Sequence, residues 1–199
     1  MSRRAKVLIV VLVAVLAASL FYLRTLARRI FFQIPQQIEE TARTRLSEVA
    51  LQAGKGPQET AVLYFPSYDE GKLLPETRAI TWASSDTDRI KQVLLALIEG
   101  SQLGHGRALP PSTMVRAVFL TPEGTAYVDF SNELQAAFAP GVRSESLAVY
   151  SVVNSVTKNI VSVKSLKILI QGQEVESLDG HADLTEAYAP DPTLVASGP

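Results

Sequence analysis

His105, His181 and Asp183 are the residues of this 199-residue chain whose types first suggest metal binding or acid–base catalysis. Asp183 follows His181 by two residues, whereas His105 lies far away in a glycine-containing stretch. A zinc site needs three or four converging ligands, and two histidines from distant loops supply too few. We therefore interpret His181 as a turn residue with local hydrogen bonds.

Asp129 lies in the middle of a predicted strand, where aspartate is disfavoured. Its carboxylate could serve as a catalytic group in an envelope hydrolase. An aspartate beside a turn more often accepts hydrogen bonds from the backbone, and Ser131 and Asn132 come next in a turn-like stretch. We predict a structural role for Asp129, and we predict no catalytic, cofactor-binding or metal-binding residue in this chain.

Other chemical motifs are excluded by their residue types. The chain has no cysteine, which removes disulfides, thiolate nucleophiles and cysteine-ligated metal sites. The glycines at 100, 104 and 106 lack the lysine and hydroxyl of a phosphate-binding loop, and they follow a predicted helix instead of preceding one. No G-x-S-x-G or H-E-x-x-H motif is present. We expect no cofactor and no enzymatic activity.

Charge divides the chain into two unequal parts. Residues 1–58 hold nine Lys/Arg and three Asp/Glu, a net charge of +6. Residues 59–199 hold ten Lys/Arg and seventeen Asp/Glu, a net charge of −7, which gives the total of −1. An acidic globular part is a poor match for nucleic acid, because phosphate neutralisation dominates that binding. We therefore exclude nucleic acid as a partner.

The basic N-terminal end accompanies an apolar run, which predicts a single-pass membrane protein. We expect a cytoplasmic leader over 1–6, a transmembrane anchor over 7–27 and a helical stalk with a hinge over 28–58. A cleaved signal peptide is the alternative, but the apolar run continues past its small residues without a clean cleavage site. A basic leader favours export of the chain beyond the anchor, so we expect residues 28–199 to be extracytoplasmic, periplasmic in a cell with two membranes.

Hydrophobic periodicity predicts an α/β domain over residues 59–187 and a disordered tail over 188–199. We expect strands at 61–65, 76–81, 114–120, 125–130 and 166–170, with a brief return at 174–176. We expect helices at 86–100, capped by Ser85 or Asp86, and at 144–160, capped by Ser144. Each helix has one apolar stripe, so we predict a two-layer α+β sandwich: one small mixed or antiparallel sheet with both helices on one face.

Several segments of the predicted domain resemble the GerMN domain of sporulation and spore-germination proteins. They cover residues 60–184 in order and include Val62-Leu63-Tyr64-Phe65, Leu94–Gly100, Tyr127–Ser131, Leu147–Thr157 and Gly172–His181. Two features depart from the family: Gly100 is followed by Ser101-Gln102 where the family usually reads Gly-Pro, and one domain is present where the protein that names the family has two.

The resemblance implies a compact domain similar to the ring-building modules of secretion and engulfment machinery. It also implies a non-enzymatic, anchored protein of the bacterial cell envelope that binds an envelope protein or associates with itself. A module that binds cell-wall glycan or peptidoglycan is the alternative, and it would require exposed aromatic residues clustered around Trp82 or Tyr68.

Overall fold

The computed structural model describes residues 58–138 and 141–196. The predicted leader, membrane anchor and nearly all of the stalk lie outside these residues, as do the last three residues of the chain. Within the described ranges, no helix is both long enough and apolar enough to cross a bilayer.

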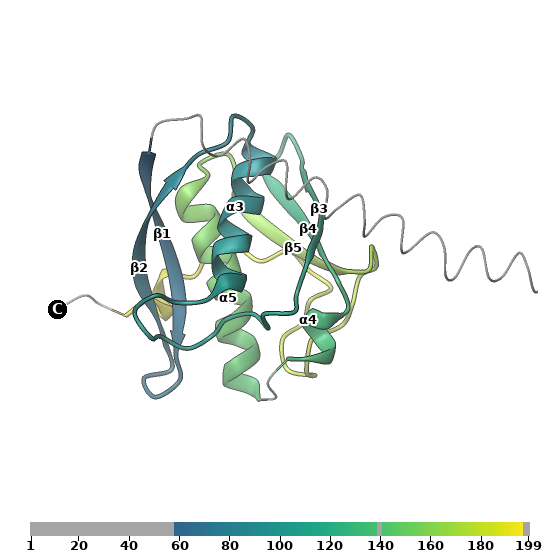
Figure 1. Cartoon of the computed structure of the whole chain (residues 1–199). Helices are drawn as coiled ribbons and strands as arrows, with labels where there is room; N and C mark the ends of the chain where they lie inside the picture. The colour runs from purple at the N-terminus through teal and green to yellow at the C-terminus, as the bar shows by residue number, and fades with distance from the viewer. Residues whose placement is uncertain (1–57, 139–140, 197–199) are drawn as a thin grey trace, which may run out of the picture. The chain divides into compact units, whose positions relative to one another are not determined.

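Two separate sheets enclose the two longer helices (Figure 1). The first sheet is an antiparallel hairpin of β1 (Gln58–Ser67) and β2 (Lys72–Thr81). The second has the strand order β3-β4-β5, with an antiparallel β3–β4 pair and a parallel β4–β5 pair. Its strands are β3 (Val115–Leu120), β4 (Thr125–Phe130) and β5 (Ser165–Ile170). The helices are α3 (Asp86–Glu99), the short α4 (Glu133–Ala136), α5 (Val142–Asn159) and the 3₁₀ turn η3 (Pro192–Leu194).

The mixed α+β class is confirmed, but the prediction of one sheet with two layers is wrong. In Figure 1 the hairpin lies on one side of α3 and α5, and the three-stranded sheet lies on the other. The reason is that α5 has two buried faces. Its apolar face includes Val149, Val153 and Val156, and a second buried face is formed by small polar residues.

That second face binds the edge of β1 through three side chains spaced four residues apart. Asn159 accepts a hydrogen bond from the Val62 N–H at 3.0 Å and donates to the Val62 carbonyl at 2.7 Å. Ser155 accepts from the Tyr64 N–H at 2.9 Å, and Ser151 donates to the Tyr64 carbonyl. Residues i, i+4 and i+8 lie on one helix face, so α5 satisfies this edge much as a neighbouring strand would.

The helix termini agree only in part with the sequence. Ser85 caps α3 as predicted, with its side chain accepting from the Asp88 N–H at 3.2 Å. The predicted cap Ser144 is wrong, because α5 begins at Val142 after Gly141 and has no side-chain cap. The predicted return strand at 174–176 is also wrong: these three residues form no strand, and the residue before them, Gln173, makes an isolated bridge to Ile170.

Residues 188–196 are packed against the domain, so the prediction that the disordered tail starts at 188 is wrong. Tyr188 and Leu166 exchange two backbone hydrogen bonds of 2.8 Å. Asn154 binds the backbone N–H and carbonyl of Asp191, each at 2.9 Å. The three prolines of residues 188–199 suggested disorder, whereas distant residues on β5 and α5 supply the partners that the backbone of 188–196 needs.

Gly106 closes the end of the β1 edge, and its replacement by alanine should destabilise the fold. Its N–H donates to the Pro66 carbonyl at 2.8 Å, and an added Cβ would lie 2.6 Å from that oxygen and 2.8 Å from the Tyr68 ring. We expect Gly106→Ala to lower the free energy of unfolding by about 2–3 kcal/mol, through a lost hydrogen bond and overpacking. Urea unfolding of the purified full chain measures this.

Gly104→Ala is the matched control. No atom lies within 4 Å of its added Cβ, so only its left-handed backbone (φ 81°) opposes the substitution. We expect a loss of about 1–2 kcal/mol from that backbone term. A larger loss at Gly104 than at Gly106 would contradict the role assigned to the close approach to Pro66.

Candidate protein-binding edge

The residues singled out for metal or acid–base chemistry are held by local contacts. His181 lies 3.7 Å from Asp179, and its backbone N–H donates to the buried carboxylate of Glu145 at 2.9 Å. Asp183 accepts hydrogen bonds from the Thr185 hydroxyl and N–H, and these lower the pKa of its carboxyl group. Within residues 58–138 and 141–196, no group of three or more His, Cys, Asp or Glu side chains could hold a metal ion.

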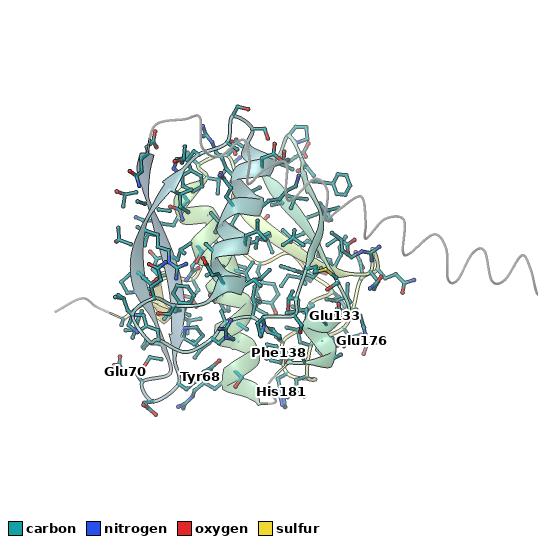
Figure 2. All side chains as sticks on the ribbon, viewed as in Figure 1. Tyr68, Glu70, Glu133, Phe138, Glu176 and His181 are labelled. Carbon is teal, nitrogen blue, oxygen red and sulfur yellow. The ribbon has the colours of Figure 1, made fainter. Side chains whose placement is uncertain are left out.

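An open hollow of about 450 Å³ lies beside these residues and includes Glu176, His181 and Asp183 in its lining. Figure 2 shows His181 beside the N-terminal end of α5, with Glu176 in the neighbouring loop. The Ser177 hydroxyl in its wall accepts a local hydrogen bond from the Gly180 N–H at 2.7 Å. Asp183 and Thr185 also line the hollow, and their hydroxyl–carboxylate hydrogen bond is a local turn contact between residues two apart in the chain.

Asp129 connects β4 to the turn after β5. Its carboxylate accepts from the Gly172 N–H at 2.7 Å and lies 3.8 Å from the Arg116 guanidinium. Burial raises the pKa of Asp129, and the Gly172 hydrogen bond and the Arg116 charge offset part of that rise. The backbone hydrogen bond is of the kind predicted, although it comes from residue 172 and not from the turn at 131–132.

The two aromatic residues proposed for a glycan surface do not form an exposed cluster. Trp82 is partly buried and packs against the hydrophobic core. Tyr68 is 40% exposed at the end of the hairpin (Figure 2), and its hydroxyl donates to the Arg107 carbonyl at 2.7 Å.

In the described part of the chain, three of the four sheet edges are covered or interrupted. Side chains of α5 and the N–H of Gly106 satisfy the β1 edge. At β5, Leu166 pairs with Tyr188, and Ile170 pairs with Gln173. At β2, Leu73 pairs with Val195, and the next residue that faces outward is Pro75, which has no N–H to donate. Pro75 therefore interrupts this edge, which is open only beyond it, at Thr77 and Ala79.

The β3 edge is open along its whole regular length. Thr121 donates its N–H to Thr125 at 3.0 Å, so the backbone groups of alternate residues, Val118 and Leu120, face away from β4. Among the described residues, no hydrogen bond to these outward groups is found. Phe119 is 64% exposed beside them, on the sheet face opposite the helices, directly across from Tyr127.

A β-bulge at Arg116 limits this edge without placing a free charge on it. The register shifts between Val115 and Ala117, which shortens the regular edge to Ala117–Leu120. Sheet edges are often protected by a projecting charge. Here the Arg116 side chain is 6% exposed and donates to Gln171 at 2.6 Å, beside Asp129. The edge therefore combines free backbone groups with an apolar, uncharged surface.

The sequence predicted the strand but not this site. Its signal was the run Ala117-Val118-Phe119-Leu120, four consecutive apolar residues in a strand that borders a turn. A half-buried strand normally alternates apolar and polar residues, so such a run indicates either burial on both faces or an exposed apolar face.

Comparison with protein families supports the resemblance to the GerMN domain. The family model described as "Germane: Sporulation and spore germination" matches residues 62–176. Among curated proteins, no match is found.

Two solved GerMN structures share the fold. The tandem GerMN domains of the sporulation protein GerM from Bacillus subtilis are 23% identical to this chain, with a TM-score of 0.55. The match covers 67% of this chain and 46% of the tandem structure, so this chain spans about half of that structure. The first GerMN domain of the same protein is 24% identical, with a TM-score of 0.53, and the match covers 68% of this chain and 98% of that one. A putative lipoprotein from Clostridium perfringens is 23% identical to this chain, with a TM-score of 0.48. The match covers 70% of this chain and 93% of the lipoprotein chain.

The family match spans more than half of the chain and contains β3, β4, α5 and β5, the elements that build and support the open edge. This chain belongs to the Germane family of sporulation and spore germination domains.

Proposed function

We propose that this protein is a non-enzymatic assembly module of the bacterial cell envelope, anchored by its N-terminal segment, and that it binds a partner protein through β3. The observation that carries the proposal is the open β3 edge in a fold whose other sheet edges are covered or interrupted. An extended partner segment would add a strand, hydrogen bonding to Val118 and Leu120 and covering Phe119. Envelope location and anchoring rest on the sequence and on the family.

Backbone pairing suits an assembly role because it needs little specific chemistry. The outward N–H and C=O groups at Val118 and Leu120 offer four hydrogen bonds, and Phe119 supplies an apolar contact beside them. Aromatic side chains at the centre of an interface often contribute a large share of the binding free energy. A glycan ligand has less support, because Trp82 and Tyr68 present no joint aromatic surface.

In-cell photo-crosslinking tests this proposal. A photoreactive phenylalanine analogue replaces Phe119, or one of two other exposed apolar residues, Leu103 (68% exposed) and Val161 (94% exposed). We expect protein adducts at position 119 and few at the other two. Mass spectrometry then identifies the adduct as another protein or a second copy of this chain.

Two variants locate the contact within the edge, with the photoreactive residue placed at position 117. Val118→Pro removes an outward N–H that the β3–β4 ladder does not use, and Phe119→Ser removes the apolar side chain. We expect each to reduce the adduct about tenfold, as for loss of a central interface residue. Leu103→Ser, which also removes an exposed apolar side chain, should leave the adduct unchanged. Equal yields in all variants, or adducts only at 103 and 161, would reject the β3 edge.

A further inference from the structure

A groove of about 380 Å³ lies between the second half of α5 and the C-terminal segment. Its apolar wall includes Tyr64 of β1, Val163 after α5, and Pro190 and Pro192 of the C-terminal segment. The groove exists because residues 188–196 are packed against α5 and β5, and it is separate from the outward groups of β3.

The cations at this groove have no partner within the described part of the chain. The described residues contain ten lysines and arginines, and eight of them use their side chains in hydrogen bonds or ion pairs. The remaining two are Lys158 and Lys164, and both line the groove. Lys164 has a weak electrostatic influence on the exposed Glu123, without an ion pair. In a domain that carries a net charge of −7, from ten basic and seventeen acidic residues, two unpaired cations at one groove favour an anionic ligand.

The other polar groups of the wall are already used. Asn154 binds the backbone of Asp191, and the Thr157 hydroxyl donates to the Val153 carbonyl at 2.8 Å. The Tyr64 side chain is part of the wall, and burial raises the pKa of its phenol. The groove therefore offers donors and apolar surface, and among the described residues no carboxylate side chain lines it.

We propose that this groove binds an extended acidic peptide segment of a partner protein. Carboxylates of such a segment would pair with Lys158 and Lys164, and its apolar side chains would cover the prolines, Tyr64 and Val163. Glycans need many hydrogen-bonding partners, and the wall has few free ones. Phosphate polymers and lipid headgroups would satisfy the lysines but would leave the apolar wall uncovered.

Selection of peptides by the full chain tests this site. The probe is a displayed library of random nine-residue peptides, and the affinity of the enriched peptides is measured by fluorescence anisotropy. We expect peptides with two or more acidic residues beside apolar ones, and an affinity that falls as salt concentration rises. The double variant Lys158→Glu/Lys164→Glu should weaken binding about tenfold, the combined effect of two exposed ion pairs.

The controls separate this proposal from its alternatives and from the β3 edge. Lys158→Arg/Lys164→Arg should retain binding, and thermal unfolding should show that both double variants are folded. Val118→Pro should leave peptide binding unchanged, because this variant alters the β3 edge and not the groove. The groove proposal and the β3 proposal can therefore be rejected separately. Enrichment of peptides without acidic residues, equal binding by the charge-reversed variant, or binding only to phosphatidylglycerol vesicles or poly(glycerol phosphate) would overturn the peptide proposal.

Discussion

Glu76→Ala should lower the free energy of unfolding by about 3–5 kcal/mol, the range for removing one partner of a buried ion pair. Glu76 and Arg78 are 2% and 7% exposed, and an oxygen and a nitrogen of the pair lie 2.7 Å apart. The variant leaves the Arg78 guanidinium buried without its main counter-charge. Denaturation of the full chain in urea, followed by circular dichroism, measures the loss.

The effect is large because Glu76 also organises the loop after α3. Its carboxylate accepts from the Ser101 hydroxyl at 2.6 Å and from the Gln102 N–H at 3.1 Å. Arg78 in turn donates to the Ala96 and Gly100 carbonyls at the end of α3, a helix with no basic residue in its last turn. Arg78 therefore supplies a positive charge at the C-terminus of α3, and Glu76 holds that side chain in place, so the pair connects β2 to α3.

Glu99→Ala is the matched control for this ion pair. Glu99 lies 3.3 Å from the same guanidinium, but its side chain is 72% exposed. Solvent screening reduces the contribution of exposed pairs, so we expect a loss of at most about 1 kcal/mol. If the Glu99 variant lost as much stability as the Glu76 variant, the buried pair would not have the role assigned to it.

The pH dependence of the free energy of unfolding is an independent test of the same ion pair. Burial alone would raise the pKa of Glu76, but hydrogen bonds from Ser101, Gln102 and Arg78, with the Arg78 charge, hold that pKa below its usual value of 4.5. A lowered folded-state pKa adds stability above the unfolded-state value, and this stability is lost as the pH falls through the folded-state pKa. The stability difference between wild type and Glu76→Gln should therefore narrow on acidification below about pH 4.5.

Asn159→Leu should lower the free energy of unfolding by about 2–4 kcal/mol. The amide of Asn159 satisfies both the N–H and the C=O of Val62, and leucine of similar size leaves both backbone groups without a partner. Each unsatisfied, partly buried group costs about 1–3 kcal/mol. Urea unfolding measures the total loss of stability. Faster hydrogen exchange at the Val62 amide would show that the loss arises at the β1 edge.

Thr157→Val serves as the control on the same helix. The Thr157 hydroxyl donates only to carbonyls of α5 itself, at Val153 and Asn154, so no strand backbone depends on it. We expect a change within about 0.5 kcal/mol. A loss at Thr157 equal to that at Asn159 would mean that the helix, and not the β1 edge, accounts for the effect.

Local patterns predicted the helices and strands well and their assembly poorly. The stripe from Ile90 to Ile98 identified α3, because apolar residues three and four apart must face one core. The second face of α5 was overlooked, since Ser151, Ser155 and Asn159 are small polar residues that look solvent-exposed in a sequence. Their partners, Val62 and Tyr64, lie about 90 residues earlier in the chain, and local periodicity carries no information about such contacts.

The candidate site shows the same division between local and distant information. The sequence identified β3 as a strand and excluded cysteine chemistry, and it predicted no nucleic-acid binding, because these inferences depend on residue types and charge alone. That Arg116 is neutralised by Asp129, and that Lys158 and Lys164 remain without partners among the described residues, depends on which side chains fold back onto the domain.

By itself, the sequence determined the α+β class and the acidic character of the domain, since composition and periodicity act residue by residue. Its resemblance to GerMN segments indicated the family. Only the tertiary structure decided that the strands divide into two sheets and that β3 stays open. The status of a sheet edge depends on backbone hydrogen bonds between segments far apart in the chain, such as Leu166 with Tyr188 and Leu73 with Ala196.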